Sequence, residues 1–197
     1  MIDDQTIQVY DDRSDQYARE NAETAARDPY LAGFISACPT GGRVLDLGCG
    51  PGHAAKQMAQ AGLETDATDA SSQMVALAAL HPGVSARQAT FDQISGTAIY
   101  DGIWASFSLL HASRAAFPGH LAAIHTALKP NGTFYIGMKL GTDEARDDIG
   151  RLYTYYTADG LQKHLQQAGF TVLNQSFGSS IGLDGVMADW VAVTAHG

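Results

Sequence analysis

The stretch VLDLGCGPG, residues 44–52, joins a short apolar run to three glycines at alternate positions. The apolar run predicts a buried strand over residues 43–47. Glycine lacks a Cβ and tolerates positive φ, so the glycines allow a sharp turn and a close approach of a ligand to the backbone. We therefore expect a strand, a loop and then a helix over residues 53–61. The loop either binds a nucleotide-like ligand or is only a tight turn.

The composition is typical of one soluble domain with a core of its own. The chain has 197 residues, of which 45% are hydrophobic and 17% charged. Its formal net charge of −9 disfavours binding to a nucleic acid or a membrane surface, because an acidic surface repels phosphate groups. Cys38 and Cys49 lack the spacing of metal ligands, which favours no metal and a reducing, cytoplasmic setting. The first residues do not form a signal peptide, and no apolar run is long enough to span a bilayer.

Predicted strands and helices alternate along the rest of the chain. The other predicted strands cover residues 63–68, 84–89, 100–105, 133–138, 170–176 and 190–195. The other predicted helices cover residues 15–26, 72–80, 120–128 and 161–168. This alternation predicts an α/β fold with a mostly parallel, seven-stranded sheet and helices on both faces. No helix separates the last two strands, so the final strand is expected to be antiparallel.

The kind of nucleotide follows from the spacing of the glycines and from one acid. His53 stands where the dinucleotide-binding fingerprint needs a glycine, and no lysine–serine pair follows the loop, so a phosphate cradle is not favoured. Asp69 ends the second predicted strand and can accept hydrogen bonds from both hydroxyl groups of a ribose. The alternative is that Asp69 only stabilises the N-terminus of the next helix.

Seven blocks of the sequence resemble those of class I S-adenosylmethionine-dependent methyltransferases of the small-molecule type. In chain order they are VLDLGCGPGHAAKQMA, ATDASSQMVALA, ARQATFDQI, YDGIWASFSLLH, ALKPNGTFYIGM, AGFTVLN and DWVAVTAH. The resemblance covers about residues 40–197 and implies a Rossmann-like fold with S-adenosyl-L-methionine as the cofactor. It also implies a single domain over residues 1–197, with a helical cap at 1–38 and a substrate lid at 141–160.

The resemblance places the cofactor contacts at the ends of the first four strands. The implied residues are Tyr10, Tyr17, Asp46, Gly48, Cys49, Gly50, Gly52, Asp69, Ala70, Met74, Thr90, Phe91, Ala105 and Ser106. Asp69 would hold the ribose, and one of the two tyrosines would reach the cofactor's carboxylate. The family often has aspartate at the position of Thr90, so Asp92 is an alternative contact with the adenine. Asp46 needs a partner in its apolar strand, either the cofactor's ammonium group or the backbone of the glycine turn.

The acceptor side has fewer candidates, because methyl transfer requires alignment of the reactants and needs a general base only for some acceptors. His111 is a candidate base or orienting donor, and packing is its alternative role. In the lid, Arg146 and Arg151 are candidates to hold an acidic acceptor. Tyr153 and Tyr156 are candidate walls of the pocket, or they pack on the edge of the sheet.

The expected function is methyl transfer to a small-molecule acceptor by in-line displacement, in a monomer or homodimer. Residues 105–108, ASFS, lack the Asn/Asp-Pro-Pro-aromatic motif that methylation of nucleic-acid amines usually shows. One alternative is a non-catalytic module that binds S-adenosylmethionine or S-adenosylhomocysteine as a sensor or partner subunit. A nicotinamide oxidoreductase is a further alternative, which His53 disfavours.

Overall fold

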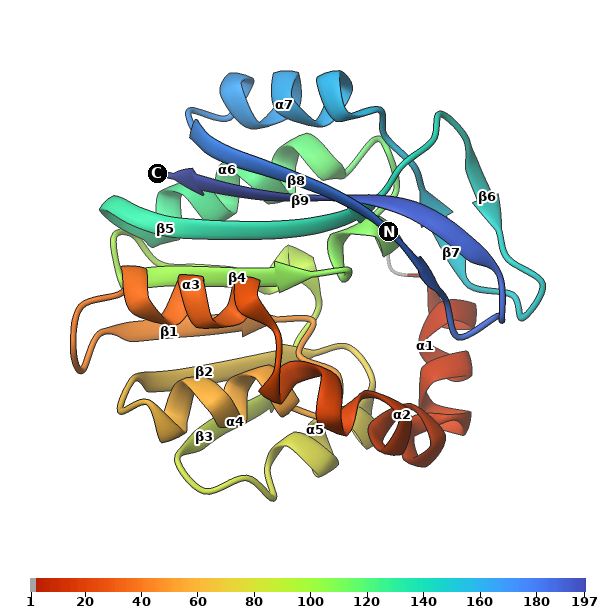
Figure 1. Cartoon of the computed structure of the whole chain (residues 1–197), viewed down its shortest axis with the longest axis horizontal. Coiled ribbons are helices and arrows are strands. Elements are labelled where there is room, and N and C mark those ends of the chain that lie inside the picture. Colours follow the sequence, from red (N-terminus) through yellow and green to blue (C-terminus); the bar gives the residue numbers. More distant parts are fainter. Residues whose placement is uncertain (1–2) are drawn as a thin grey trace.

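A central sheet organises the computed structural model, which describes residues 3–197 except for the side chains of residues 20–24. Its seven strands lie in the order β3-β2-β1-β4-β5-β9-β8 (Figure 1). In chain order these strands are Arg43–Leu47 (β1), Glu64–Asp69 (β2), Val84–Gln88 (β3), Tyr100–Ser106 (β4), Leu128–Lys139 (β5), Thr171–Ile181 (β8) and Met187–His196 (β9). Only β9 runs antiparallel to its neighbours, which confirms the predicted α/β fold and its antiparallel final strand.

Helices cover both faces of this sheet. The helices are Asp4–Asp12 (α1), Ser14–Ala26 (α2), Pro29–Ala37 (α3), His53–Gln60 (α4), Ser72–Ala78 (α5), Phe117–Ala127 (α6) and Ala158–Gln167 (α7). On one face, α3 and α4 bury Phe34 and Met58 against Trp104 of β4. On the other, α6 and α7 bury Leu121 and Leu165 against the neighbouring strands. Side chains alternate between the faces of a strand, so each central strand contributes to both cores.

The N-terminal helices lie at the edge of the sheet where the parallel strands end (Figure 1). In this region the residue pattern predicts a helix over residues 15–26 only, and α1 lies in the helical cap at 1–38 that the family resemblance implies. Helix α1 contacts α5, and α2 contacts α4. Together they cover the end of the sheet at which ligands bind in open α/β folds.

Three further segments differ from the sequence-based expectation. Residues 141–160 contain a small hairpin of strands Glu144–Arg146 (β6) and Leu152–Thr154 (β7) that the polar sequence does not indicate. Strand β5 begins at Leu128, before the expected residue 133, and includes an irregular stretch with Asn131 at φ +62°. Strands β8 and β9 extend well beyond residues 170–176 and 190–195, because their pairing continues to Ile181 and Met187. In the part of the chain described, no helix is both long and apolar enough to cross a membrane.

Candidate cofactor and acceptor site

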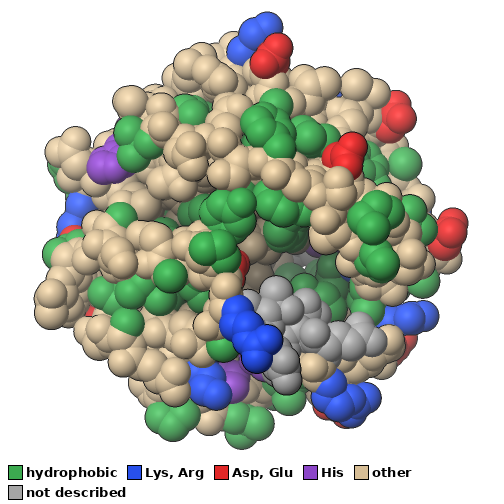
Figure 2. Space-filling view, viewed as in Figure 1, with side chains coloured by type: hydrophobic (Ala, Val, Ile, Leu, Met, Phe, Trp, Pro, Cys, Tyr) green, Lys and Arg blue, Asp and Glu red, His purple; other side chains and the backbone are tan. Residues whose placement is uncertain are grey.

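A cavity of about 640 Å³ lies at the carboxyl ends of the parallel strands. Its walls come from α1, the glycine loop, the ends of β2, β4 and β5, β7, and the β8–β9 hairpin. Figure 2 shows this face of the molecule hollowed beside the N-terminal helices, with hydrophobic side chains around the hollow. The volume is in the range of sites that enclose cofactors and small substrates.

The glycine loop is held tightly against the segment that follows β4. The backbone N–H groups of Gly48 and Cys49 both donate to the carbonyl oxygen of Thr68, at 2.7 and 2.9 Å. Gly48 has φ +72°, and a Cβ there would lie 2.3 Å from Cβ of Ser108. The hydroxyl group of Ser108 donates to the carbonyl oxygen of Leu47 at 2.6 Å, so Ser108 has little room to move. Glycine at position 48 is therefore required both by the backbone conformation and by the close approach of Ser108.

Asp69 presents its carboxylate to the cavity from the end of β2. Its two oxygens accept hydrogen bonds from the backbone N–H groups of Gly50 and Ser71, each at 2.9 Å. Burial raises the pKa of this carboxyl group. Each carboxylate oxygen has two lone-pair positions, so both oxygens of Asp69 can accept a further hydrogen bond from a ligand. Ser71, rather than Asp69, caps α5 through the N–H of Met74.

Asp11 attaches α1 to the same helix, a contact that the sequence does not indicate. Its carboxylate accepts hydrogen bonds from the hydroxyl group of Ser71 at 2.5 Å and from the N–H of Gln73 at 3.2 Å. A negative charge at the start of a helix is favourable, so Asp11 holds α1 over the end of the cavity that contains Asp69. An acid 60 residues away from its partner in the chain carries no local sequence signal.

Asp46 lines the cavity although only 3% of it is exposed. Its carboxylate accepts a hydrogen bond from the N–H of Ala55, in the first turn of α4, at 3.0 Å. Burial raises the pKa of Asp46 to about 7, because the low-dielectric surroundings disfavour the charged form. The backbone partner of Asp46 thus lies in α4 and not in the glycine turn, and no hydrogen bond joins the second carboxylate oxygen to the residues that the structure describes.

The predicted adenine end also lies in this cavity. Ala70, Met74, Thr90 and Phe91 all line it, together with Asp92. Thr90 precedes a short 3-10 turn, Phe91–Gln93, and its backbone N–H donates to the side chain of Gln93 at 2.9 Å. Because both Thr90 and Asp92 border the cavity, either side chain is placed to contact an adenine.

Two residues assigned to the cofactor do not line the cavity. Ala105 is fully buried in the core on the α6 side of the sheet, since the alternation along β4 places Ser106 at the cavity instead. Gly52 faces α5: a Cβ there would lie 2.8 Å from Cα of Ala78. Glycine at this position allows α4 and α5 to pack closely and makes no contact with the cavity.

We expect the substitution Gly52→Ala to lower stability and leave cofactor binding unchanged. Gly52 has φ +79°, so alanine adds backbone strain to the clash with α5, about 2–4 kcal/mol in all. Denaturant unfolding measures the loss, and calorimetry below the unfolding transition measures affinity for S-adenosylhomocysteine. Gly62→Ala is the matched control, because Gly62 has φ +86° but no atom within 4 Å of the added Cβ. An equal loss in both variants would show that the contact with Ala78 is unimportant.

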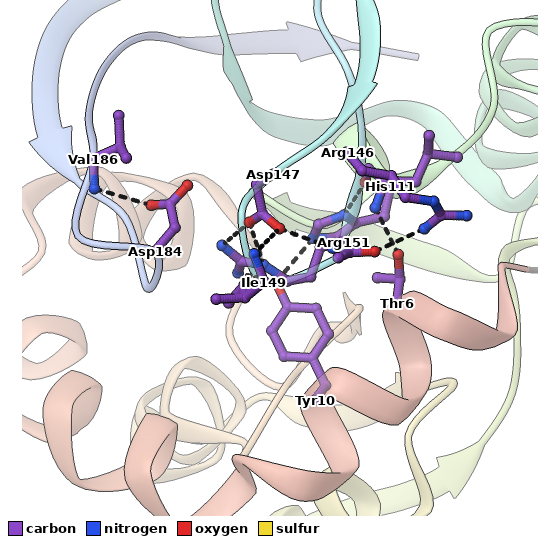
Figure 3. A network of polar contacts seen from close by, with 11 residues as sticks. Thr6, Tyr10, His111, Arg146, Asp147, Ile149, Arg151, Asp184 and Val186 are labelled. Atoms are coloured by element: carbon purple, nitrogen blue, oxygen red, sulfur yellow. Dashed lines mark hydrogen bonds and ion pairs between the residues drawn. The ribbon is translucent and has the colours of Figure 1, made fainter.

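A directional hydrogen-bond network joins α1 to the β6–β7 hairpin at the other end of the cavity (Figure 3). Nδ1 of His111 lies 2.6 Å from the carbonyl oxygen of Leu152 and must donate to it, so Nε2 is the acceptor of the neutral ring. The Tyr10 hydroxyl group, 2.9 Å from Nε2, then donates to His111 and accepts from Nη1 of Arg151 at 2.9 Å. Burial lowers the pKa of His111 to about 4, so the ring is neutral near pH 7.

Arg151 is neutralised within the protein. Its side chain is 2% exposed, and Nε and Nη2 lie 2.9 and 2.7 Å from the carboxylate of Asp147, whose side chain is also buried. The guanidinium group also lies over the rings of Tyr10 and Tyr153. Tyr17 packs edge-on against Tyr10, with ring centroids 5.7 Å apart, and both tyrosines line the cavity.

Two further residues assigned to the acceptor lie outside the cavity. Arg146 does not line the cavity: it pairs with Asp3 at 2.8 Å, and its side chain is 41% exposed. Tyr156 is buried against Phe117, with ring centroids 4.7 Å apart. These contacts make Arg146 a connection between α1 and the hairpin, and Tyr156 a core residue.

The structure adds Lys139 and Phe107 to the cavity wall. Lys139 ends β5, and its Nζ lies 4.4 Å from the ring centroid of Tyr153. Phe107 follows β4 with φ +53°, a rare conformation for a bulky residue, and packs against Trp190. Residue type alone gives no signal that either side chain would face a ligand. Within residues 3–197, no cluster of three or more His, Cys, Asp or Glu is placed to hold a metal ion.

Comparison with known sequence families supports one assignment. The methyltransferase domain family matches residues 17–175, which include the glycine loop and all strands through the start of β8. This chain belongs to that family. The fold is that of the class I methyltransferases, and the cofactor of this methyltransferase is S-adenosylmethionine. A comparison with proteins of curated function finds no match.

Solved structures share the fold of this methyltransferase at low sequence identity. A Burkholderia thailandensis 1,6-didemethyltoxoflavin N1-methyltransferase, bound to 1,6-didemethyltoxoflavin and S-adenosylhomocysteine, is 21% identical, with a TM-score of 0.69; 96% of this chain and 87% of that chain are covered. An S-adenosylmethionine-dependent methyltransferase from Mesorhizobium loti is 20% identical, with a TM-score of 0.71 and coverages of 89% and 100%. A complex from Haloferax volcanii joins the Trm112 methyltransferase activator to a putative methyltransferase. One chain of this complex is 20% identical, with a TM-score of 0.72, and the match covers 94% of this chain and 96% of that chain.

The residues present fit S-adenosylmethionine better than a phosphate-bearing nucleotide. Asp69 and Asp46 lie at the end of the cavity formed by the glycine loop, and among the described residues no lysine or arginine lines that end. Carboxylates suit ribose hydroxyl groups and the positive charges of S-adenosylmethionine, and they repel phosphates. His53, which replaces the dinucleotide glycine, points its ring to the carbonyl oxygen of Ala18 at 2.8 Å and so secures α2.

Proposed function

We propose that this methyltransferase methylates a small-molecule acceptor. The observation that carries the proposal is one continuous cavity with two chemically different ends. One end has the glycine loop, Asp69 and Phe91, and the other has His111, Tyr153 and Trp190. The volume of about 640 Å³ suits a cofactor with a small acceptor beside it.

The chain holds the cofactor by contacts of three kinds. Asp69 accepts hydrogen bonds from the ribose, and Ala70, Met74 and Phe91 pack against the adenine. Asp46 pairs with the ammonium group of the amino-acid part, which lies along the backbone of the glycine loop. When bound, S-adenosylmethionine supplies a methyl group activated by the sulfonium charge.

The protein's own contribution to the reaction is alignment and exclusion of water. Helix α1 is attached to the hairpin through Thr6, whose hydroxyl oxygen accepts from the N–H of Leu152 at 2.8 Å, and through the Tyr10–His111 contact. These contacts place α1 over the cavity, where a covered site orients reactants and raises the rate of displacement. Both ring nitrogens of His111 are engaged, so we assign it a positioning role through Tyr10 rather than the role of a general base.

Titration calorimetry with S-adenosylmethionine and S-adenosylhomocysteine, followed by an acceptor screen, tests the proposal. We expect micromolar binding of both, and release of S-adenosylhomocysteine with at least one small-molecule acceptor. Binding without turnover across a broad panel would favour the non-catalytic sensor or partner subunit instead. Absence of binding would overturn the assignment of the cavity.

We expect cofactor affinity to increase with pH in a way that depends on Asp46. In the free protein the pKa of Asp46 is raised to about 7. The protonated carboxyl group therefore contributes to the stability of the folded protein at low pH, and this contribution is lost as the pH rises through about 7. A positively charged ligand favours the ionised carboxylate, so binding releases a proton. Affinity should rise about tenfold between roughly pH 6 and pH 8 and then level off.

Calorimetry at several pH values in buffers of different ionisation enthalpy measures this effect. Asp46→Asn keeps an oxygen that can accept from the N–H of Ala55 but cannot ionise, so its affinity should be independent of pH over the same range. Identical pH profiles for the variant and the wild type would assign the dependence to another group.

A further inference from the structure

Lys139 is a cation inside the cavity that has no acidic partner among the described residues. It is the last residue of β5, is half-buried, and lies with Nζ 4.4 Å from the ring centroid of Tyr153. It forms no ion pair with any residue that the structure describes, within residues 3–197. A cation–π contact offsets part of the cost of partly burying the ammonium group, and an anionic ligand would offset more of it.

The charges that surround Lys139 leave it free to bind an anion. Asp147 is occupied by two nitrogens of Arg151. Asp184, in the loop between β8 and β9, accepts from the N–H of Val186 at 3.2 Å. It lies near Lys139, since a Cβ at Gly182 would be 2.5 Å from Oδ1 of Asp184 and 3.1 Å from Nζ of Lys139, but the two make no ion pair. Because Arg151 is paired with Asp147, Lys139 is the cation in this part of the cavity that a ligand can still pair with, and burial lowers its pKa.

The walls around Lys139 are mainly apolar and aromatic. Tyr153 lies beneath the ammonium group, and Phe107, Leu183 and Trp190 line the same end of the cavity. Such walls suit an apolar ring or chain, and one polar group among them fixes its orientation. A carboxylate or ionised phenol on that ligand would meet Lys139, because no other cation that the structure describes in this cavity is free to pair with it.

We propose that Lys139 binds an anionic group of the methyl acceptor, so that the acceptor is an aromatic or similarly apolar molecule that carries a carboxylate or ionised phenol. This inference rests on the proposed function and adds a specificity-determining residue to it. It also replaces Arg146 and Arg151, the two residues expected from the sequence to hold an acidic acceptor. Arg146 lies outside the cavity, and Arg151 is already paired with Asp147.

Matched pairs of charged and neutral probes test the inference even while the acceptor is unidentified. Benzoate and salicylate are compared with benzamide and salicylamide, which have nearly the same shape but lack the carboxylate. Affinities are measured by calorimetry and ligand-observed NMR, with and without saturating S-adenosylhomocysteine. We expect the wild type to bind the acids about tenfold more tightly than the amides.

The variant Lys139→Met should lose this preference and bind acid and amide equally, while its affinity for S-adenosylhomocysteine stays at the wild-type value. Lys163→Met, on the exposed side of α7, is the matched control and should keep the preference. If thermal unfolding shows that Lys139→Met is unstable, Lys139→Gln is used in the same binding comparison. An undiminished preference in the Lys139 variants, or no binding of the acids to the wild type, would overturn the inference.

Two other outcomes separate this inference from the proposed function. Loss of S-adenosylhomocysteine binding in Lys139→Met would assign the lysine to the cofactor's carboxylate and overturn its role toward the acceptor. If the wild type fails to bind S-adenosylhomocysteine at all, the proposed function fails. The ratio of acid to amide binding, measured without S-adenosylhomocysteine, still tests Lys139 in that case.

Discussion

Replacing Asp69 by asparagine should weaken the binding of S-adenosylmethionine and S-adenosylhomocysteine by about 100-fold. Hydrogen bonds to a charged acceptor contribute roughly 1.5–3 kcal/mol each, and the ribose offers two donors to this carboxylate. An asparagine keeps one oxygen acceptor but has no charge and directs an amide N–H₂ group at the remaining donor. Calorimetry measures the affinities, and circular dichroism confirms that the variant is folded.

The control for Asp69→Asn lies on the same strand. Glu64→Gln changes an exposed acid at the opposite end of β2, far from the cavity, and removes only a contact with Arg43 at the surface. We expect its cofactor affinity to equal that of the wild type. If Asp69→Asn binds the cofactor within about threefold of the wild-type affinity, Asp69 does not bind the ribose. Its role would then be limited to the hydrogen bonds with the backbone of Gly50 and Ser71.

Replacing Gly48 by alanine should destabilise the protein by about 3–5 kcal/mol and abolish cofactor binding at ordinary concentrations. The added Cβ would lie 2.3 Å from Cβ of Ser108, and the residue would keep a left-handed backbone with φ +72°. Relief of the clash would displace Ser108 from its hydrogen bond with Leu47 and shift the glycine loop. For a chain of this size, we expect the melting temperature to fall by roughly 10 °C.

Gly185→Ala separates the two contributions to this loss. Gly185 has φ +77°, in the loop between β8 and β9, and no atom lies within 4 Å of an added Cβ. Alanine there adds backbone strain of about 1–2 kcal/mol without a clash. If Gly48→Ala costs no more than Gly185→Ala, the contact between the glycine loop and Ser108 is not tight in solution.

The architecture could be predicted from the sequence because its signals are local. The apolar run at residues 43–47, the glycines after it and the regular alternation of strands and helices each depend on neighbours in the chain. Helix α1 and the β6–β7 hairpin lack such signals, since both are short and polar and are stabilised by contacts with distant residues. The contact of Thr6 with Leu152 joins residues 146 positions apart in the chain.

For the site, the residues predicted at strand ends line the cavity more often than those predicted in the lid. Asp46, Gly48, Cys49, Gly50, Asp69 and Ser106 line it because a strand end and its loop have few alternative directions. Ala105 is only one position from Ser106, and that step turns a side chain to the opposite face of the sheet. Arg146 and Arg151, in the segment predicted as a lid, have long side chains: Arg146 pairs with Asp3 before α1, and Arg151 pairs with Asp147 in the hairpin and donates to Tyr10 of α1.

The α/β fold, the glycine loop and the acid at the end of β2 follow from the sequence alone, because they depend on local residue types. Which of the described charges remain unpaired in the cavity depends on the tertiary structure. Arg151 is neutralised by Asp147, His111 is held by Tyr10 and Leu152, and Lys139 has no acidic partner within residues 3–197. Charge pairing depends on distances between side chains from α1, the hairpin and β5, and those distances are set only when the elements pack together.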